Sequence, residues 1–146
     1  MMIPQRISAR AAAVAAAVAL IALGGAIQAQ DKPKPKRPKV TLRASPAIAF
    51  TPATLTFTAD IKDGDNDFEE YYCASVEWDW ADGTRSESSD DCEPYEAGKS
   101  EIRRRYTVQH KYNIEGVYDV KFKLKQRDKT VASAQTKVTI RPGMGQ

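Results

Sequence analysis

The stretch SVEWDWADGT, residues 75–84, places two tryptophans beside three acidic residues, Glu77, Asp79 and Asp82. Carboxylates next to aromatic rings suit a sugar-cleaving enzyme, which holds two carboxyl groups about 5–10 Å apart across a cleft. Alternation along this stretch instead predicts that Asp79 faces outward from a strand, and Asp82, which precedes a glycine, is predicted to lie in a turn. We therefore do not expect an enzyme.

A Ser–His–Asp or Cys–His catalytic arrangement would have to use His110, the only histidine of the chain. The sequence has no G-x-S-x-G segment, which forms the nucleophile turn of many hydrolases. We expect His110 to be structural and to form a hydrogen bond with a neighbouring loop.

The acidic stretch DGDNDFEE, residues 63–70, could bind a metal. Asp63, Asp65 and Asp67 alternate as at the start of a calcium loop, because Ca²⁺ prefers several hard oxygen ligands. An EF-hand would then need glycine and glutamate where this chain has Phe68 and Ala74. A solvated acidic hairpin with no cofactor is the favoured interpretation, and calcium binding stays open as the alternative.

The first residues have the composition of a secretory signal peptide. Arg6 and Arg10 precede the apolar run 11–23, and small residues follow it up to Ala29. We expect a signal peptide over residues 1–29 and an exported chain, periplasmic or secreted, with no membrane segment after cleavage. An uncleaved anchor is the alternative, although the run is shorter than the roughly 20 apolar residues that a span needs.

Export determines how the two cysteines are interpreted. Cys73 and Cys92 are an even number in an oxidising compartment, where a disulfide is expected. A zinc site is the alternative, but two thiols and one distant histidine form a poor one.

Residues 30–39 contain alternating proline and basic residues, which predict a stiff, extended linker. The whole chain has a net charge of +3, but residues 40–146 contain 15 basic and 18 acidic residues. Nucleic acid is therefore not an expected partner.

The elements that must position these residues are strands, since apolar and polar residues alternate with period two from Val40 onward. Turns rich in glycine, asparagine and aspartate separate the runs. This pattern predicts a single all-β domain over residues 40–141, an antiparallel β-sandwich followed by a short tail at 142–146. The predicted strands include the runs 55–61, 74–80, 102–109, 118–124 and 134–140.

Two segments resemble one known family. WDWADGTRSES (78–88) looks like the W-D-F-G-D-G segment of PKD (polycystic-kidney-disease-type) domains, and HKYNIEGVYDVKFKL (110–124) looks like their H-x-Y-x-x-x-G-x-Y-x-V segment. The resemblance implies an Ig-like β-sandwich. In this sequence Ala81 replaces the first glycine of the turn, and the segment 86–109 is longer than usual. The structural residues that the resemblance implies are Trp78 and Trp80 in the core, Asp82 and Gly83 in the turn, and His110, Tyr112, Gly116 and Tyr118 at a second corner.

The resemblance further implies an exported, non-catalytic binding or adhesion module whose partners are proteins or polysaccharides at the cell envelope. Tyr71, Tyr72 and Tyr95 are the candidate binding residues, because exposed aromatic rings can stack on a sugar or fill a protein pocket. A calcium-dependent structural element of an envelope or extracellular assembly is the alternative. The oligomeric state stays open.

Overall fold

The computed structural model describes residues 32–145. The expected signal peptide, its cleavage site and the first two linker residues lie outside this range. Within residues 32–145, no helix is long and apolar enough to cross a membrane.

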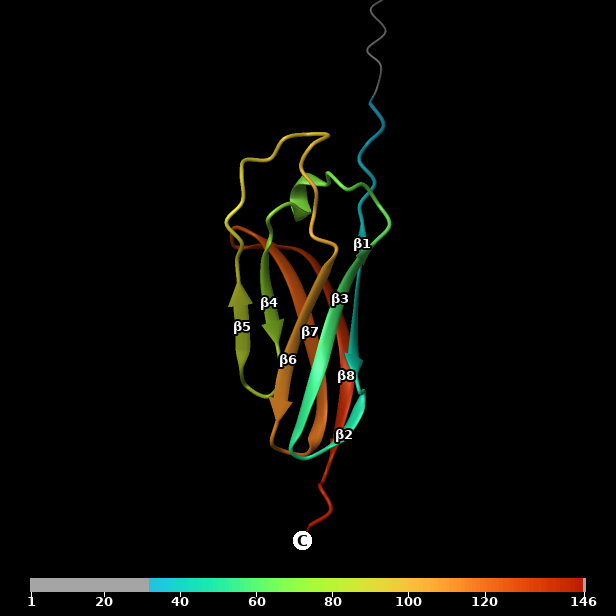
Figure 1. The fold of residues 1–146 in the computed structure, drawn as a ribbon, viewed down its shortest axis with the longest axis vertical. Helices are drawn as coiled ribbons and strands as arrows, with labels where there is room; N and C mark the ends of the chain where they lie inside the picture. Colours follow the sequence, from blue (N-terminus) through green and yellow to red (C-terminus); the bar gives the residue numbers. More distant parts are fainter. Residues whose placement is uncertain (1–31, 146) are drawn as a thin grey trace, which may run out of the picture. The chain divides into compact units, whose positions relative to one another are not determined.

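The described chain forms two β-sheets packed face to face (Figure 1). One sheet has three strands in the order β1-β3-β6, and the other has five in the order β2-β8-β7-β4-β5. A single 3₁₀ turn, η1, precedes β4. The strands are β1 (Lys39–Ser45), β2 (Ile48–Phe50), β3 (Ala53–Lys62), β4 (Ser75–Asp79), β5 (Arg85–Ser88), β6 (Arg105–Tyr112), β7 (Gly116–Gln126) and β8 (Lys129–Arg141), and η1 spans Glu69–Tyr71.

This architecture confirms the predicted all-β, Ig-like sandwich, and the strands expected from alternation are present as β3, β4, β6, β7 and β8. Two differences are found. The short strand β2 pairs with β8 in parallel, whereas the other pairings are antiparallel. Strand β5 was not predicted, because its four residues, RSES, are all exposed and lack apolar alternation.

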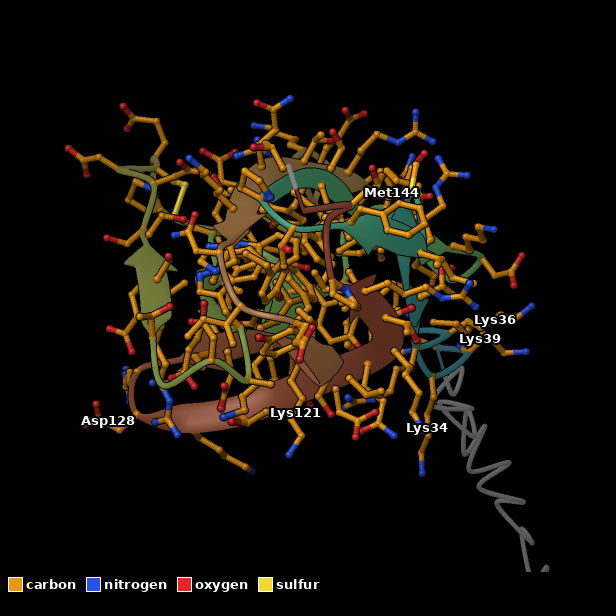
Figure 2. The ribbon with its side chains drawn as sticks, turned by 90° about the horizontal axis from the view of Figure 1, so that it is seen from below. Lys34, Lys36, Lys39, Lys121, Asp128 and Met144 are labelled. Carbon is orange, nitrogen blue, oxygen red and sulfur yellow. A yellow bond between two sulfur atoms is a disulfide. The ribbon has the colours of Figure 1, made fainter. Side chains whose placement is uncertain are left out.

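The core lies between the sheets, as the view along the strands shows (Figure 2). Inward residues of β3, β4 and β7 are almost fully buried, while Lys121 on the outer face of β7 points into solvent. Each buried large apolar side chain contributes about 1.5–3 kcal/mol relative to exposure. The fully buried members are Leu55, Phe57, Trp80, Tyr112, Val120, Phe122, Leu124 and Val138.

The outer face of the five-stranded sheet holds a buried carboxylate, Glu77. Alternation predicts Glu77 on the solvent side, but its side chain is only 7% exposed. Lys123 and Lys125 of the neighbouring β7 cover it, with their Nζ atoms 2.8 and 3.0 Å from its oxygens. Hydrogen bonds from these lysines outweigh desolvation and lower the pKa of Glu77 from 4.5 to about 2.

Charges also pair across the strands of the three-stranded sheet. Asp60 of β3 is buried, and Arg105 of β6 donates a hydrogen bond to it at 2.6 Å. This hydrogen bond outweighs desolvation and lowers the pKa of Asp60. Residues 60–101 contain 15 acidic and 3 basic residues, and residues 102–146 contain 3 acidic and 11 basic ones. The Glu77–Lys123 and Asp60–Arg105 pairs join these two regions, so their opposite charges are partly neutralised across neighbouring strands.

The end of the predicted linker packs against the domain. Lys36 donates its backbone N–H to the Asp65 carboxylate at 2.6 Å and accepts the Asp65 N–H at its own C=O. A Cβ atom at Gly64 would overlap the backbone of Lys36 and Pro38, so this close approach requires glycine. Arg37 pairs with Glu70. Residues 36–38 are thus fixed to the sandwich, because the 63–67 turn supplies partners for their backbone.

Candidate functional site: one end of the sandwich

The two tryptophans of the stretch 75–84 lie in the core. The Trp78 and Trp80 rings stack with centroids 5.3 Å apart and planes 4° apart. The Trp80 ring also stacks on His110 at 4.3 Å, and its Nε1 donates to the Ser86 hydroxyl at 2.9 Å. These contacts hold both rings in the core, where Trp78 is 5% and Trp80 1% exposed.

The two carboxylates of this stretch have structural partners in the β4–β5 turn. Asp79 faces outward as predicted, but its side chain is only 23% exposed, since it accepts the N–H of Ala81 and lies 3.4 Å from Arg85. Asp82 accepts the Thr84 N–H at 2.9 Å. Ala81, where the PKD pattern has glycine, adopts a left-handed φ of 60°.

His110 holds this turn against β6. Its Nε2 lies 2.7 Å from the Asp82 carboxylate. Burial of Asp82 opposes ionisation, but hydrogen bonds from Thr84 and His110 outweigh it and lower the pKa of Asp82. The histidine thus has the hydrogen bond to a neighbouring loop that we expected.

The second corner implied by the resemblance also has structural contacts. Tyr112 is buried and donates its hydroxyl to the Trp80 C=O at 3.0 Å, and burial raises its pKa well above 10. Tyr118 packs on Tyr112 at 4.4 Å and donates to the Ile114 C=O. Gly116 lies beside the Tyr118 ring, where a Cβ atom would form an ordinary contact at 3.4 Å.

The candidate calcium residues have separate partners. The Asp65 carboxylate binds the backbone of Lys36, and the Asp67 carboxylate accepts the Gly98 N–H at 2.8 Å. Asp63 contributes its backbone C=O to the Arg104 guanidinium at 2.5 Å. Within residues 32–145, no group of three metal-binding side chains converges.

Arg104 occupies the middle of this acidic turn. Besides Asp63, its guanidinium contacts the C=O of Gly64 at 3.3 Å and the side-chain oxygen of Asn66 at 2.5 Å. Oxygen atoms of this kind are the ligands that calcium would use. The Arg104 guanidinium therefore binds backbone and amide oxygens of the acidic turn, whereas the Asp65 and Asp67 carboxylates bind other groups.

The disulfide between Cys73 and Cys92 is present, as predicted. It ties the residues before β4 to the long segment 89–104 that follows β5. That segment has no helix or strand and lies at the same end of the sandwich as η1 (Figure 1).

The three candidate binding tyrosines have different environments. Tyr71 is 2% exposed and donates to the Pro38 C=O, so the expectation that it contacts a ligand is wrong. Its ring packs under Arg37 and beside Phe68, which closes the end of the core. Tyr72 and Tyr95 remain half-buried, with ring centroids 5.6 Å apart.

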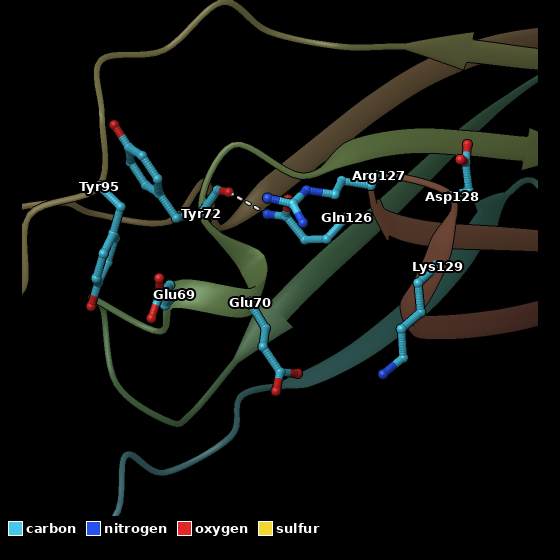
Figure 3. A pocket seen from close by; sticks show the side chains of 8 residues that line it. All are labelled: Glu69, Glu70, Tyr72, Tyr95, Gln126, Arg127, Asp128 and Lys129. Carbon is cyan, nitrogen blue, oxygen red and sulfur yellow. Dashed lines mark hydrogen bonds between the residues drawn. The ribbon is translucent and has the colours of Figure 1, made fainter.

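Tyr72 and Tyr95 line a shallow hollow of about 850 Å³ (Figure 3). The Tyr72 hydroxyl donates to the Glu93 C=O and the Tyr95 hydroxyl to the Asp67 C=O, which fixes both rings. Burial, with Asp67 and Glu69 nearby, raises the pKa of Tyr95 and keeps it a donor. The other residues that line the hollow are Glu69, Glu70, Gln126, Arg127, Asp128 and Lys129.

Sequence reasoning missed the contribution of the β7–β8 turn to this hollow. Gln126 donates its side-chain amide to the Tyr72 C=O at 2.6 Å, and Arg127 has a left-handed φ of 54°. The sequence did not reveal this contact, because the two partners are 54 positions apart. The β7–β8 turn becomes part of this surface because it lies beside η1 in the folded chain.

Two half-buried tyrosines therefore line a mixed-charge hollow at one end of an immunoglobulin-like β-sandwich. No family model and no curated protein matches this chain. Solved structures do resemble it. The solution structure of the CARDB domain of the PF1109 protein from Pyrococcus furiosus is 12% identical, with 73% of this chain and 97% of that one covered and a TM-score of 0.51.

A PKD domain of an M14-like peptidase from a Thermoplasmatales archaeon is 16% identical, covering 73% of this chain and 98% of that one at a TM-score of 0.49. The crystal structure of the same CARDB domain, in complex with di-metal ions, is 11% identical, covering 74% and 97% at a TM-score of 0.46. PKD and CARDB domains are Ig-like β-sandwiches, so the fold of this chain agrees with that expected from the resemblance. At these identities the likeness concerns the fold alone.

Proposed function

We propose that this chain is an exported, non-catalytic binding module that engages a protein partner through the hollow at the Tyr72–Tyr95 end. The observation that carries the proposal is that these two rings combine partial exposure with a fixed position. They are partly exposed, yet hydrogen bonds and the nearby disulfide hold them in place. Rigid aromatic side chains lose little conformational entropy on binding, which is why tyrosine is favoured in interfaces.

The geometry favours a protein over a polysaccharide. The planes of Tyr72 and Tyr95 are 58° apart, so the rings do not form the flat platform on which successive sugars would stack. Both hydroxyls already donate to backbone carbonyls. Acidic residues of η1 and basic residues of the β7–β8 turn surround the hollow, and this mixture suits the charged side chains of a protein surface.

Export is supported by the composition of residues 1–29 together with the disulfide, since oxidising compartments preserve such bonds. The absence of catalysis is supported by the structural use of the candidate groups. His110 and Asp82 form a hydrogen bond that holds the β4–β5 turn against β6, and the charge of Glu77 is neutralised by two lysines. The calcium-dependent alternative is weakened by Arg104, which occupies the acidic turn.

The test is capture of a partner from the native envelope fraction by the oxidised protein, with variants that separate the site from the rest of the surface. Tyr95→Ala and Tyr72→Ala should abolish capture, and Tyr95→Phe, which keeps the ring, should retain it. Phe50→Ala is the matched control, because Phe50 is an aromatic residue 56% exposed on β2, outside the hollow.

Capture that survives both alanine substitutions in folded protein would contradict the proposed site. A parallel glycan-binding assay separates the ligand classes. Binding of a soluble polysaccharide that is lost in Tyr95→Ala would replace the protein partner with a polysaccharide.

A further inference from the structure

Strand β5 is an open edge of the five-stranded sheet. It pairs with β4 on one side only, and its four residues are exposed. In both overall views it lies at the outside of the molecule, and no strand of residues 32–145 covers its other side (Figures 1 and 2). An open edge presents unpaired backbone N–H and C=O groups to any strand that can pair with it.

The ladder between β4 and β5 determines which groups are free. Trp80 donates its backbone N–H to the Thr84 C=O at 3.2 Å, so this pair is hydrogen-bonded. Residues of an antiparallel strand alternate between facing one neighbour and facing the other. The backbone groups of Arg85 and Glu87 therefore point away from β4, toward the open side.

The side chains of the same two residues are opposite in charge and share one face. Arg85 and Glu87 lie on the outer face of the sheet, 65% and 66% exposed, while Ser86 faces inward and accepts the Trp80 indole N–H. If two β5 strands pair antiparallel about a twofold axis at Ser86, Arg85 of each copy stands opposite Glu87 of the other. The register that pairs the charges also pairs the free backbone groups, which gives four hydrogen bonds and two ion pairs.

The other edge strands of residues 32–145, β1, β6 and β2, lack this self-complementarity, and the part of β8 that β2 leaves unpaired, residues 129–138, carries only the cations Lys129 and Lys137. The outer faces of β1 and β6 carry cations only, Lys39 and Arg43 on β1 and Arg105 and Lys111 on β6. Antiparallel self-pairing of either strand would place like charges together, which is unfavourable. Strand β2 has three residues and no charge to set a register.

We propose that β5 is a self-association edge through which a second copy of this chain extends the five-stranded sheet into a continuous ten-stranded one. The contact involves few residues, and the surface area that it buries is well below the roughly 1,000 Å² of stable interfaces. The dimer is therefore expected at high local concentration rather than in dilute solution. It is independent of the hollow at Tyr72 and Tyr95, and either proposal can fail without the other.

Charge reversal tests the register. In sedimentation equilibrium of the oxidised protein from micromolar to millimolar concentration, Arg85→Glu and Glu87→Arg should each weaken dimerisation about 10- to 30-fold, because each creates two like-charge contacts. The double variant Arg85→Glu/Glu87→Arg should dimerise as the wild type does. An equimolar mixture of the two single variants should also recover the dimer. Asp128→Arg, a reversal in the β7–β8 turn, is the control and should change nothing.

Hydrogen exchange supplies a second readout that depends on backbone direction. The amides of Arg85 and Glu87 should gain protection as concentration rises, whereas those of Ser86 and Ser88, which already face β4, should not change. A wild-type protein that stays monomeric to about 1 mM with these two amides unprotected overturns the proposal. A dimer that is insensitive to both reversals also overturns it and places the contact elsewhere on the surface.

Discussion

Replacement of Glu77 by glutamine should destabilise the protein more than substitutions on the outer face of a sheet usually do. A carboxyl pKa lowered from 4.5 to about 2 corresponds to about 3 kcal/mol of preference for the charged form in the folded state. Lys123 and Lys125 are about a quarter exposed, so water screens part of this interaction. We expect Glu77→Gln to lower the free energy of unfolding by about 2 kcal/mol at pH 7.

The pH dependence has a definite sign. Because the folded-state pKa lies below the unfolded value, the stabilisation from Glu77 is fully present above about pH 5 and is lost as the pH falls toward 2. The pKa values of Asp60 and Asp82 are also lowered, so protonation of these carboxylates in acid removes further stabilisation. The difference between wild type and Glu77→Gln isolates Glu77 and should shrink to near zero by about pH 2.

Urea unfolding at pH 7, 5, 3 and 2 measures this difference. Glu87→Gln is the matched control, because Glu87 stands directly opposite Glu77 on β5 but is 66% exposed and lies 3.5 Å from Lys125. Glu87→Gln should lower the free energy of unfolding by less than about 0.5 kcal/mol. Equal costs for the two substitutions, or a difference that does not depend on pH, would refute the reasoning.

Other substitutions test the core, the turn and the acidic loop. Trp78→Ala should cost about 3–5 kcal/mol in a denaturant melt. Asp79→Asn should cost less than about 1 kcal/mol, because the amide oxygen can still accept the Ala81 N–H and only the charge beside the exposed Arg85 is lost; equal losses would contradict the strand phase. Ala81→Gly should stabilise by about 0.5–1 kcal/mol, since glycine relieves the left-handed φ, and a lower melting temperature would argue against it. Calcium should raise the melting temperature no more than sodium chloride at equal ionic strength, whereas a calcium-selective rise abolished by Asp65→Asn would reverse this expectation.

Alternation was enough to predict the strands of the core. Leu55, Phe57 and Phe122 are buried on the faces that period two indicates, because a sandwich must bury one face of each strand. The disulfide followed from the cysteine count and the expected compartment. Local patterns of this kind depend on near neighbours in sequence and are therefore readable from sequence alone.

The features that could not be predicted depend on residues far apart in the chain. Glu77 is buried by lysines 46 and 48 residues away, and the acidic turn is occupied by Arg104, about 40 residues downstream. Tyr71 is covered by the linker end at Pro38. In each case the arrangement of the strands determines which distant residue becomes the contact partner. Alternation predicts the face on which a residue lies, but it does not predict the neighbour of that residue across the sheet.

The disulfide gives the β4–β5 hairpin a covalent closure at its open end. Cys73 lies two residues before β4 and Cys92 four residues after β5, so the turn and the disulfide together make the hairpin a closed ring. An exposed four-residue edge strand would otherwise fray, because a single ladder holds it. In a compartment where the thiols stay reduced, the chain can fold its core while β5 remains loose. The β5 edge would then become ordered only on oxidation, so the strand pairing between copies that we propose requires the disulfide.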